Sequence, residues 1–175
     1  VIGKGSVEAL DTEGRLIKSD KVTYEKSKEF LLAEGSVEIL DNEGNIFKAD
    51  KATYDKIKEI IVTYENSELT IKEGYKLTSN SILYDTTNKI ISSNQNSTLT
   101  DLDGNFVTVS MFQYHIEKNL FSSIGEIKII DTNKNKYFFK ELYVDTKKKE
   151  MIGSDVSVVL DQENFGVSEE SDPRF

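Results

Sequence analysis

The sequence predicts an all-β domain built from five tandem copies of an antiparallel unit of 30 residues. Three observations support this prediction. The sequence resembles itself at a fixed offset, apolar residues follow a period of two, and turn-forming residues recur at the same place in each copy. A fixed period of about 20 to 50 residues is the signature of repeat architectures.

The offset is visible in the first two copies. Residues 5–34 begin with the letters GSVEALD, and residues 35–64 begin with GSVEILD. The same phase continues without a gap through the following copies, although Lys134 and Val144 replace the turn glycine and the tyrosine in the fifth. The recurring turn glycines are Gly14, Gly44, Gly74 and Gly104, and the recurring tyrosines are Tyr24, Tyr54, Tyr84 and Tyr114.

Stacking the copies gives columns of equivalent residues, and four of these columns are apolar throughout, as is the tyrosine column. Their two-residue spacing within a copy is that of a strand with one buried face. The four columns are Ala9, Ile39, Leu69, Leu99 and Ile129; Ile17, Phe47, Leu77, Val107 and Tyr137; Val22, Ala52, Ile82, Phe112 and Leu142; and Leu31, Ile61, Ile91, Phe121 and Met151.

Each copy should form two long strands, at about 14–24 and 30–40 in the first copy. The inward parity in the second copy changes near residues 49–51, which predicts a β-bulge there. Asp41-Asn42-Glu43-Gly44 and residues 55–58 have the composition of turns. Long strands that bend midway favour two facing antiparallel sheets, a β-jelly roll. A parallel β-helix is the alternative, but the turns suit hairpins and the strands are long for it.

Composition excludes several classes of protein. The chain has no Cys, so it uses neither disulfides nor thiolate metal sites, and its net charge of −9 argues against nucleic-acid binding. No apolar run approaches the roughly 18 residues of a membrane helix. The pattern is already under way at the first residues, so we expect that any targeting segment has been removed.

No residue set predicts catalysis, a metal site or a cofactor. His115 is the only histidine and stands at a strand-to-turn boundary, where a solvated side chain is expected. Asp101-Leu102-Asp103-Gly104-Asn105 has some likeness to a calcium loop, but Phe112 stands where such a loop needs Glu. Residues 147–149 are three lysines in a turn; solvation is the expected role, and contact with a lipid phosphate or sugar is the alternative. The sequence therefore predicts a protein that is not an enzyme.

The unit Gly-x-Val-x-Ile-x-Asp-x-x-Gly, followed by Ala49-Asp50-Lys51-Ala52-Thr53-Tyr54-Asp55, resembles the OstA-like repeat of lipopolysaccharide-transport proteins from Gram-negative bacteria. The resemblance covers residues 5–161. It implies a periplasmic β-jelly roll whose opening holds lipopolysaccharide acyl chains. Some members carry cysteines that tie this domain to an outer-membrane barrel, and none is present here.

Two regions are expected: a repeat domain at residues 1–161 and an acidic tail at 162–175, which contains the only proline. Within the family, the tail favours the periplasmic N-terminal domain of the outer-membrane assembly protein over the bridging protein. It would then lead to a barrel beyond the last residue. That assignment implies a periplasmic location, with attachment to the outer membrane if the chain continues into the barrel.

The resemblance implies that the inward columns line the lipid groove. For the tyrosines, core packing is the alternative role. The groove candidates are Ala9, Ile17, Val22, Tyr24, Leu31, Val37, Ile39, Phe47, Ala52, Tyr54, Ile61, Leu69, Leu77, Ile82, Tyr84, Ile91, Leu99, Val107, Phe112, Tyr114, Phe121 and Ile129.

The first strand is expected to be an unpaired sheet edge that accepts a strand from another jelly-roll transport protein, head to tail, or from a second copy of this chain. The residues of this partner edge are Ser6, Val7, Glu8, Ala9 and Leu10.

The competing hypothesis for the whole chain is a structural or adhesive repeat domain with a filled core and no ligand.

Overall fold

A single antiparallel sheet of 14 strands forms the protein in the computed structural model, which describes residues 1–161. The tail expected at 162–175 lies outside the described residues. A short 3-10 turn, η1 (Lys26–Lys28), follows β2. The strands are β1 (Ile2–Leu10), β2 (Leu16–Glu25), β3 (Phe30–Leu40), β4 (Ile46–Asp55), β5 (Ile60–Thr70), β6 (Lys76–Asp85), β7 (Ile90–Ser93), β8 (Ser97–Thr100), β9 (Phe106–Val109), β10 (Phe112–His115), β11 (Leu120–Ile130), β12 (Lys136–Asp145), β13 (Glu150–Ser154) and β14 (Ser157–Val159).

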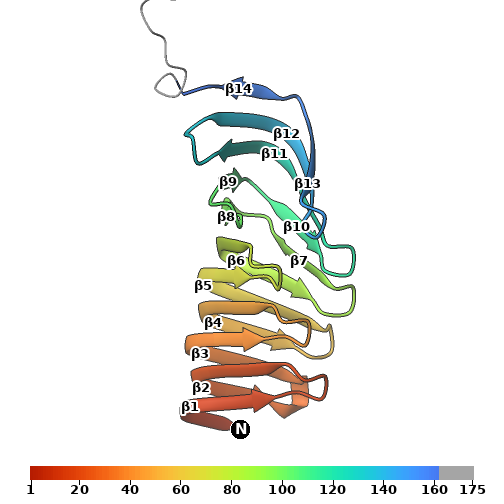
Figure 1. Ribbon diagram of the computed structural model, residues 1–175. Helices are drawn as coiled ribbons and strands as arrows, with labels where there is room; N and C mark the ends of the chain where they lie inside the picture. Colours follow the sequence, from red (N-terminus) through yellow and green to blue (C-terminus); the bar gives the residue numbers. More distant parts are fainter. Residues whose placement is uncertain (162–175) are drawn as a thin grey trace, which may run out of the picture.

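The long strands β1 to β6 each pair with their neighbours in sequence, as do β11 and β12, so the chain climbs the stack as a meander (Figure 1). The short strands depart from this order: β7 pairs with β6 and β10, β8 with β6 and β9, and β14 with β12. Every strand pairing within residues 1–161 is antiparallel. This confirms the predicted antiparallel fold and rules out the parallel β-helix, in which equivalent residues of successive copies would pair in parallel. The two facing sheets are the two halves of one continuous sheet.

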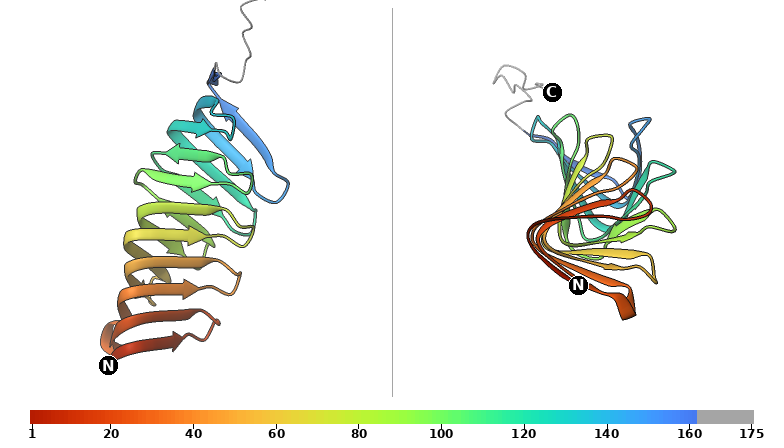
Figure 2. Two further views of the ribbon diagram at one scale, coloured as in Figure 1. Left: turned by 60° about the vertical axis from the view of Figure 1, so that its left-hand side comes forward. Right: turned by 90° about the horizontal axis from the view of Figure 1, so that it is seen from below.

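The sheet folds over along a line of β-bulges, one in each long strand pair. Between β3 and β4, Glu34 pairs with Lys51 and Val37 pairs with Ala49, so two residues of β3 face one residue of β4. A bulge is therefore present at the level of residues 49–51, as predicted, but the extra residue belongs to the neighbouring strands β3 and β5 rather than to β4. Because bulges bend and twist a strand, their alignment gives every long strand two arms that diverge from the bend (Figure 2).

The bend of β3 contains a glycine, Gly35. Its φ is +76°, and a Cβ atom there would clash with a carboxylate oxygen of Asp20. Both the left-handed backbone and the close side chain favour glycine at this position, whereas Glu65 takes the equivalent position of the third copy with a φ of +60°. Bends of this kind recur at Gly5 and Gly125, which also have positive φ values.

The core lies between the two arms and consists of the predicted columns. Ile39, Phe47, Leu69, Tyr84 and Ile91 are almost completely buried. Burial decreases at both ends of the stack, where Ala9 and Leu31 are half-buried and Met151 is exposed. This gradient follows from the meander, because the first and last copies have a neighbour on one side only.

The pattern is interrupted where the third copy passes into the fourth. The long strand at this junction is divided into β7 and β8, and the next long strand is divided into β9 and β10, with residues 94–96 and 110–111 between the pieces. Here β7 and β10 pair in one arm, and β8 and β9 pair in the other. At this place no continuous strand runs from one arm to the other.

Candidate functional site

Two rows of turns border the opening between the arms, which we call the mouth. Row A consists of the turns at 11–15, 41–45, 71–75, 101–105 and 131–135. Row B consists of the turns at 25–29, 55–59, 85–89, 115–119 and 145–149. Backbone hydrogen bonds join successive row B turns; for example, Thr86 N donates to Glu59 O at 3.0 Å. Row B is thereby a continuous ladder.

The inner faces meet in the first three copies. The rings of Phe47 and Tyr84 stack with centroids 5.5 Å apart, and the side chains of Ile61, Leu69 and Ile91 are buried around them. Native interiors are packed to about the density of organic crystals. This part of the predicted groove is therefore a filled core, as the alternative role for the tyrosines anticipated.

A buried arginine closes the mouth at the N-terminal end. Arg15, in row A, is only 2% exposed. Its guanidinium donates to the Tyr54 hydroxyl at 2.6 Å and forms an ion pair with Glu59 of row B at 3.4 Å. Tyr54 in turn donates to the same Glu59 carboxylate at 2.8 Å. Asp11 accepts from Arg15 Nε at 2.5 Å, so the charge is paired on its own arm as well.

Two weaker contacts cross the mouth in the next copies. Lys89 Nζ lies 3.9 Å from Glu43 Oε1, and the Tyr114 hydroxyl donates to Glu73 Oε2 at 3.3 Å. Both pairs join row A to row B or, for Tyr114, to the strand end beside row B. The mouth is therefore bridged by polar contacts along the first three copies.

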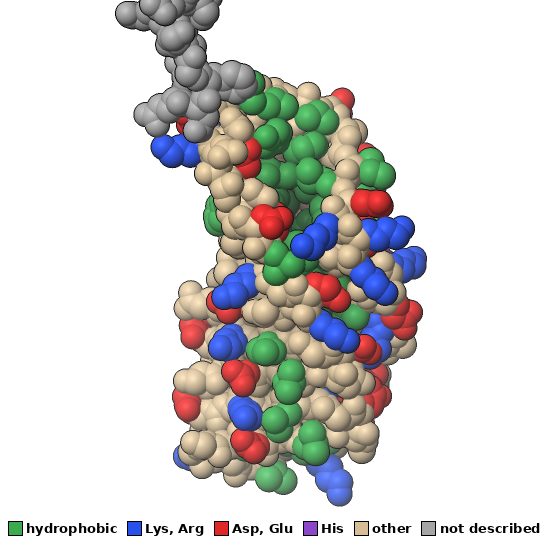
Figure 3. Space-filling view, viewed as in Figure 1, with side chains coloured by type: hydrophobic (Ala, Val, Ile, Leu, Met, Phe, Trp, Pro, Cys, Tyr) green, Lys and Arg blue, Asp and Glu red, His purple; other side chains and the backbone are tan. Residues whose placement is uncertain are grey.

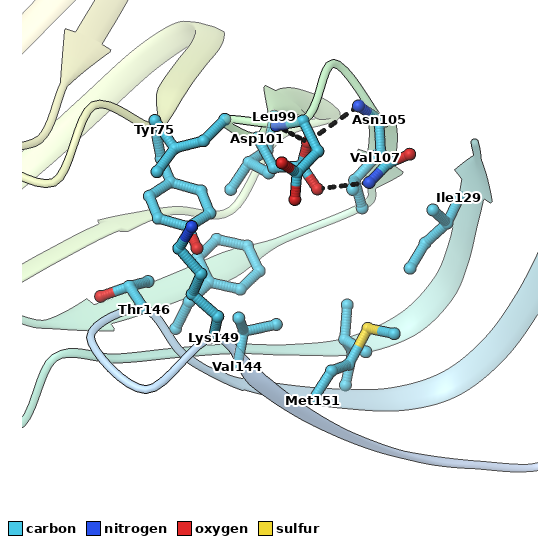
Figure 4. Close-up of a pocket in the computed structure, with 14 residues that line it drawn as sticks. Tyr75, Leu99, Asp101, Asn105, Val107, Ile129, Val144, Thr146, Lys149 and Met151 are labelled. Carbon is cyan, nitrogen blue, oxygen red and sulfur yellow. Dashed lines mark hydrogen bonds between the residues drawn. The ribbon is translucent and has the colours of Figure 1, made fainter. Parts of the chain in front are cut away.

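The arms separate in the fourth and fifth copies and leave an apolar slot. The cavity has a volume of about 250 Å³ (Figure 4). Hydrophobic side chains gather in a hollow at this end of the molecule (Figure 3). Leu99, Val107, Phe121, Ile129, Leu142, Val144 and Met151 form the apolar lining, and Tyr75, Asp101, Asp103, Asn105, Thr146 and Lys149 form a polar rim.

The tyrosines at the mouth keep their protons near neutral pH. Burial raises the pKa of Tyr54, and the hydrogen bond to Glu59 raises it further. Burial also raises the pKa of Tyr114, to about 12. The pKa of Tyr75 is raised by burial and by the nearby carboxylates of Asp101 and Asp103. These hydroxyls therefore stay protonated near neutral pH, and those of Tyr54 and Tyr114 donate hydrogen bonds to Glu59 and Glu73.

The structure brings four of the predicted groove residues to the slot: Leu99, Val107, Phe121 and Ile129. Most other candidates lie in the filled core, and Ala9, Tyr24 and Leu31 are half-buried at the N-terminal end. Leu142, Val144 and Met151 belong to the inward columns but were not among the candidates. The rim residue Tyr75 was missed because it occupies a turn column in which Asn45 and Asn105 stand in neighbouring copies.

His115 lies at the predicted strand-to-turn boundary, but its side chain is less solvated than expected. It is the last residue of β10, pairs with Ile90 and Leu120, and is half-buried.

The loop at Asp101 is an Asx turn, in which Asp101 Oδ1 accepts from the backbone N–H groups of Asp103 and Asn105. Within residues 1–161, no group of three or more His, Cys, Asp or Glu residues is arranged to hold a metal ion.

A second hollow of about 760 Å³ lies near the bend of the same two copies. It borders Ser97, Thr108, Glu126 and Lys140 and is more polar than the slot.

Among the helices of the described part of the chain, none is long and apolar enough to cross a membrane.

No protein-family profile matches this chain, and no curated protein sequence matches it. Among solved structures, it is similar to LptH of Pseudomonas aeruginosa, an LptA-homologous periplasmic component of the lipopolysaccharide transport device. That likeness has 12% identity, a TM-score of 0.34, and coverage of 85% of this chain and 96% of the other. A likeness to the TCP10 domain of CPAP from Danio rerio has 5% identity and a TM-score of 0.17, with 89% and 98% coverage. Such values are too low to bear on function.

Proposed function

We propose that this chain is a non-catalytic periplasmic module that shelters lipopolysaccharide acyl chains and passes them toward the outer membrane. The observation that supports this most is the apolar slot between the arms in the fourth and fifth copies. It opens along the mouth and is continuous with the hydrophobic core. A ligand with long apolar chains fits such a site better than a small polar substrate.

The physical benefit of a slot follows from the hydrophobic effect. Each methylene group that moves from water to an apolar site gains about 0.8 kcal/mol. A lipid with several acyl chains therefore needs a continuous apolar path to cross an aqueous compartment. The lining of Val107, Phe121 and Leu142 provides apolar surface without polar side chains that would need partners.

The finer assignment rests on the OstA-like resemblance of the repeat. Under this proposal, the chain is the periplasmic N-terminal domain of the outer-membrane assembly protein LptD, with the bridging protein LptA as the alternative. The tail that favours LptD, at 162–175, lies outside the described residues. The proposal places the chain in the periplasm, attached to the outer membrane if a barrel follows.

Adjacent residues of β12 give a matched test of lipid contact. Val144 lines the slot, whereas Tyr143 points to the outer face and is 39% exposed. With a photo-crosslinking residue at position 144, illumination in the presence of lipopolysaccharide should give a covalent adduct, because the acyl chains contact that side of the strand. The same residue at position 143 should give little adduct, and equal labelling at both positions would contradict the proposal.

We also propose that β1 docks a neighbouring transport protein. Among residues 1–161, β1 pairs with β2 alone, so the predicted partner edge at Ser6–Leu10 has one unpaired side. Exposed strand edges accept a further strand through backbone hydrogen bonds. The partner could be another jelly-roll transport protein or a second copy of this chain, stacked head to tail.

Proline substitution tests this edge. Successive backbone N–H groups of a strand point in opposite directions, so either Glu8 or Ala9 directs its N–H away from β2. One of the variants Glu8→Pro and Ala9→Pro should therefore abolish capture of a purified jelly-roll partner, while the circular dichroism spectrum stays that of a β-sheet protein. Unimpaired capture by both variants would exclude this edge.

The filled core of the first three copies favours a second candidate function, a structural or adhesive repeat domain without a ligand. In that case, the slot would be an incompletely packed end of the stack. The photo-crosslinking experiment distinguishes the two, because a structural domain would give no lipopolysaccharide adduct at position 144.

A further inference from the structure

Polar groups face one another across the mouth with a stagger of one copy. Row A of one copy contacts row B, or the tyrosine beside it, in the next copy. An acidic residue stands at the same position of row A in each of the first four copies: Glu13, Glu43, Glu73 and Asp103. At the first step, the row A residue that crosses the mouth is instead Arg15. We call the four successive steps the gate row.

The first three steps of the gate row are closed. At the first, Arg15 lies 3.2 Å from Glu13 of its own turn and 3.4 Å from Glu59 across the mouth. At the second, Lys89 lies 3.9 Å from Glu43, and at the third the Tyr114 hydroxyl lies 3.3 Å from Glu73. The pattern places Asp103 and Lys149 opposite each other at the fourth step.

The fourth step is open. Asp103 and Lys149 both line the slot, but no ion pair joins them in the described part of the chain. Figure 4 shows Lys149 on one side of the cavity and the turn that begins at Asp101 on the other. The only unbridged step of the gate row within residues 1–161 thus coincides with the apolar slot.

We propose that the fourth step is the port through which a single acyl chain enters sideways, and that Asp103 and Lys149 close over the chain once it is bound. This inference rests on the proposed function and adds the place, direction and capacity of lipid uptake. The lipid does not thread through the first three copies in this closed form.

The energetics of the two ends explain why the port lies at the fourth step. The first step is anchored by a buried guanidinium with several partners, and breaking it leaves charges without partners. A solvated pair such as Asp103 and Lys149 gains little stability from its attraction. That gain cannot hold the arms together over an empty apolar cavity, but it can add to the burial of a chain that fills the slot.

The size of the slot sets the occupant. A cavity of about 150 Å³ lined by aliphatic and aromatic residues takes up benzene, which has six carbon atoms. By proportion, the 250 Å³ slot holds a segment of roughly ten carbon atoms. That is a stretch of one acyl chain, and it is too little for the several chains of a whole lipid.

Reversible cross-links across the mouth test the port. Because the chain has no cysteine, introduced pairs supply the only thiols. The variant Asp103→Cys with Lys149→Cys places them at the fourth step, and Glu43→Cys with Lys89→Cys places them at the second. Each pair is joined with a short thiol-specific cross-linker, and uptake of a fluorescent 16-carbon fatty acid is measured by stopped flow before and after reduction.

We expect the cross-link at the fourth step to slow uptake at least tenfold and reduction to restore it. The cross-link at the second step should leave uptake unchanged, because that step is already closed. Equal slowing at both steps, or no slowing at the fourth, would overturn the inference. So would failure of the protein without cross-links to take up the fatty acid. The proposed function is decided separately, by the lipopolysaccharide adduct at position 144.

Discussion

Replacing Arg15 by methionine should lower the free energy of unfolding by about 3 kcal/mol, because the change leaves partly buried carboxylates without their cation. Asp11 and the Tyr54–Glu59 pair lose their shared donor, and the two arms lose their contact at the first step of the gate row. Glu59 is one-third exposed and can regain water, which keeps the effect at the lower end of the range for buried ion pairs. Urea denaturation of the variant and the unchanged protein measures the difference.

The matched control is Lys18→Met. Lys18 pairs with Glu8 at 3.4 Å, but both side chains are about half exposed. Exposed ion pairs contribute about 0 to 1 kcal/mol, so this variant should unfold close to the unchanged protein. Similar midpoints for the Arg15 and Lys18 variants would show that the buried cluster does not hold the arms together.

The second large effect is a difference between equivalent leucines. Leu69→Ala should cost about 4 kcal/mol of unfolding free energy, whereas Leu99→Ala should cost about 2 kcal/mol. Both residues stand in the same column, but Leu69 is fully buried in the third copy and Leu99 lines the slot in the fourth. Truncation at Leu69 creates a new cavity, while truncation at Leu99 enlarges an existing one.

Chemical denaturation of the two alanine variants tests whether the core is filled at one end and open at the other. The pair is well matched, because residue type, column and substitution are the same. Equal losses would contradict this difference in packing. A greater loss of unfolding free energy at Leu99 than at Leu69 would mean that the fourth copy is better packed than the third, the opposite of what we expect.

The fold could be predicted from the sequence because each copy repeats the same local signals. The Asp-x-x-Gly turns mark the hairpins: at 41–45, Asp41 Oδ1 accepts from the backbone of Glu43 and Asn45. The shift of the inward-facing residues from odd to even numbers near residue 50 indicated the bulge. Five copies in phase showed which columns of residues point inward. What the pattern did not reveal is that the two sheets are a single folded sheet.

The site was predicted only in part, because a column shows which way a side chain points and not how far away the opposite arm lies. Ile61 and Phe121 stand in the same column, yet one is in the filled core and the other lines the slot. The divided strands β7 to β10 lie where the filled core gives way to the slot. Arg15 was a missed signal: it is the only arginine in a column otherwise occupied by Asn and Tyr.

The claim that acyl chains occupy the slot is tested most directly by NMR of the methyl-labelled protein with bound lipopolysaccharide. Nuclear Overhauser effects should connect acyl-chain protons to the methyl groups of Val107, Ile129 and Val144, which line the cavity. Ile124 and Ile152 are exposed, by 55% and 74%, and are not among the residues of the slot. Effects confined to these two exposed residues, with none at the slot, would contradict the account.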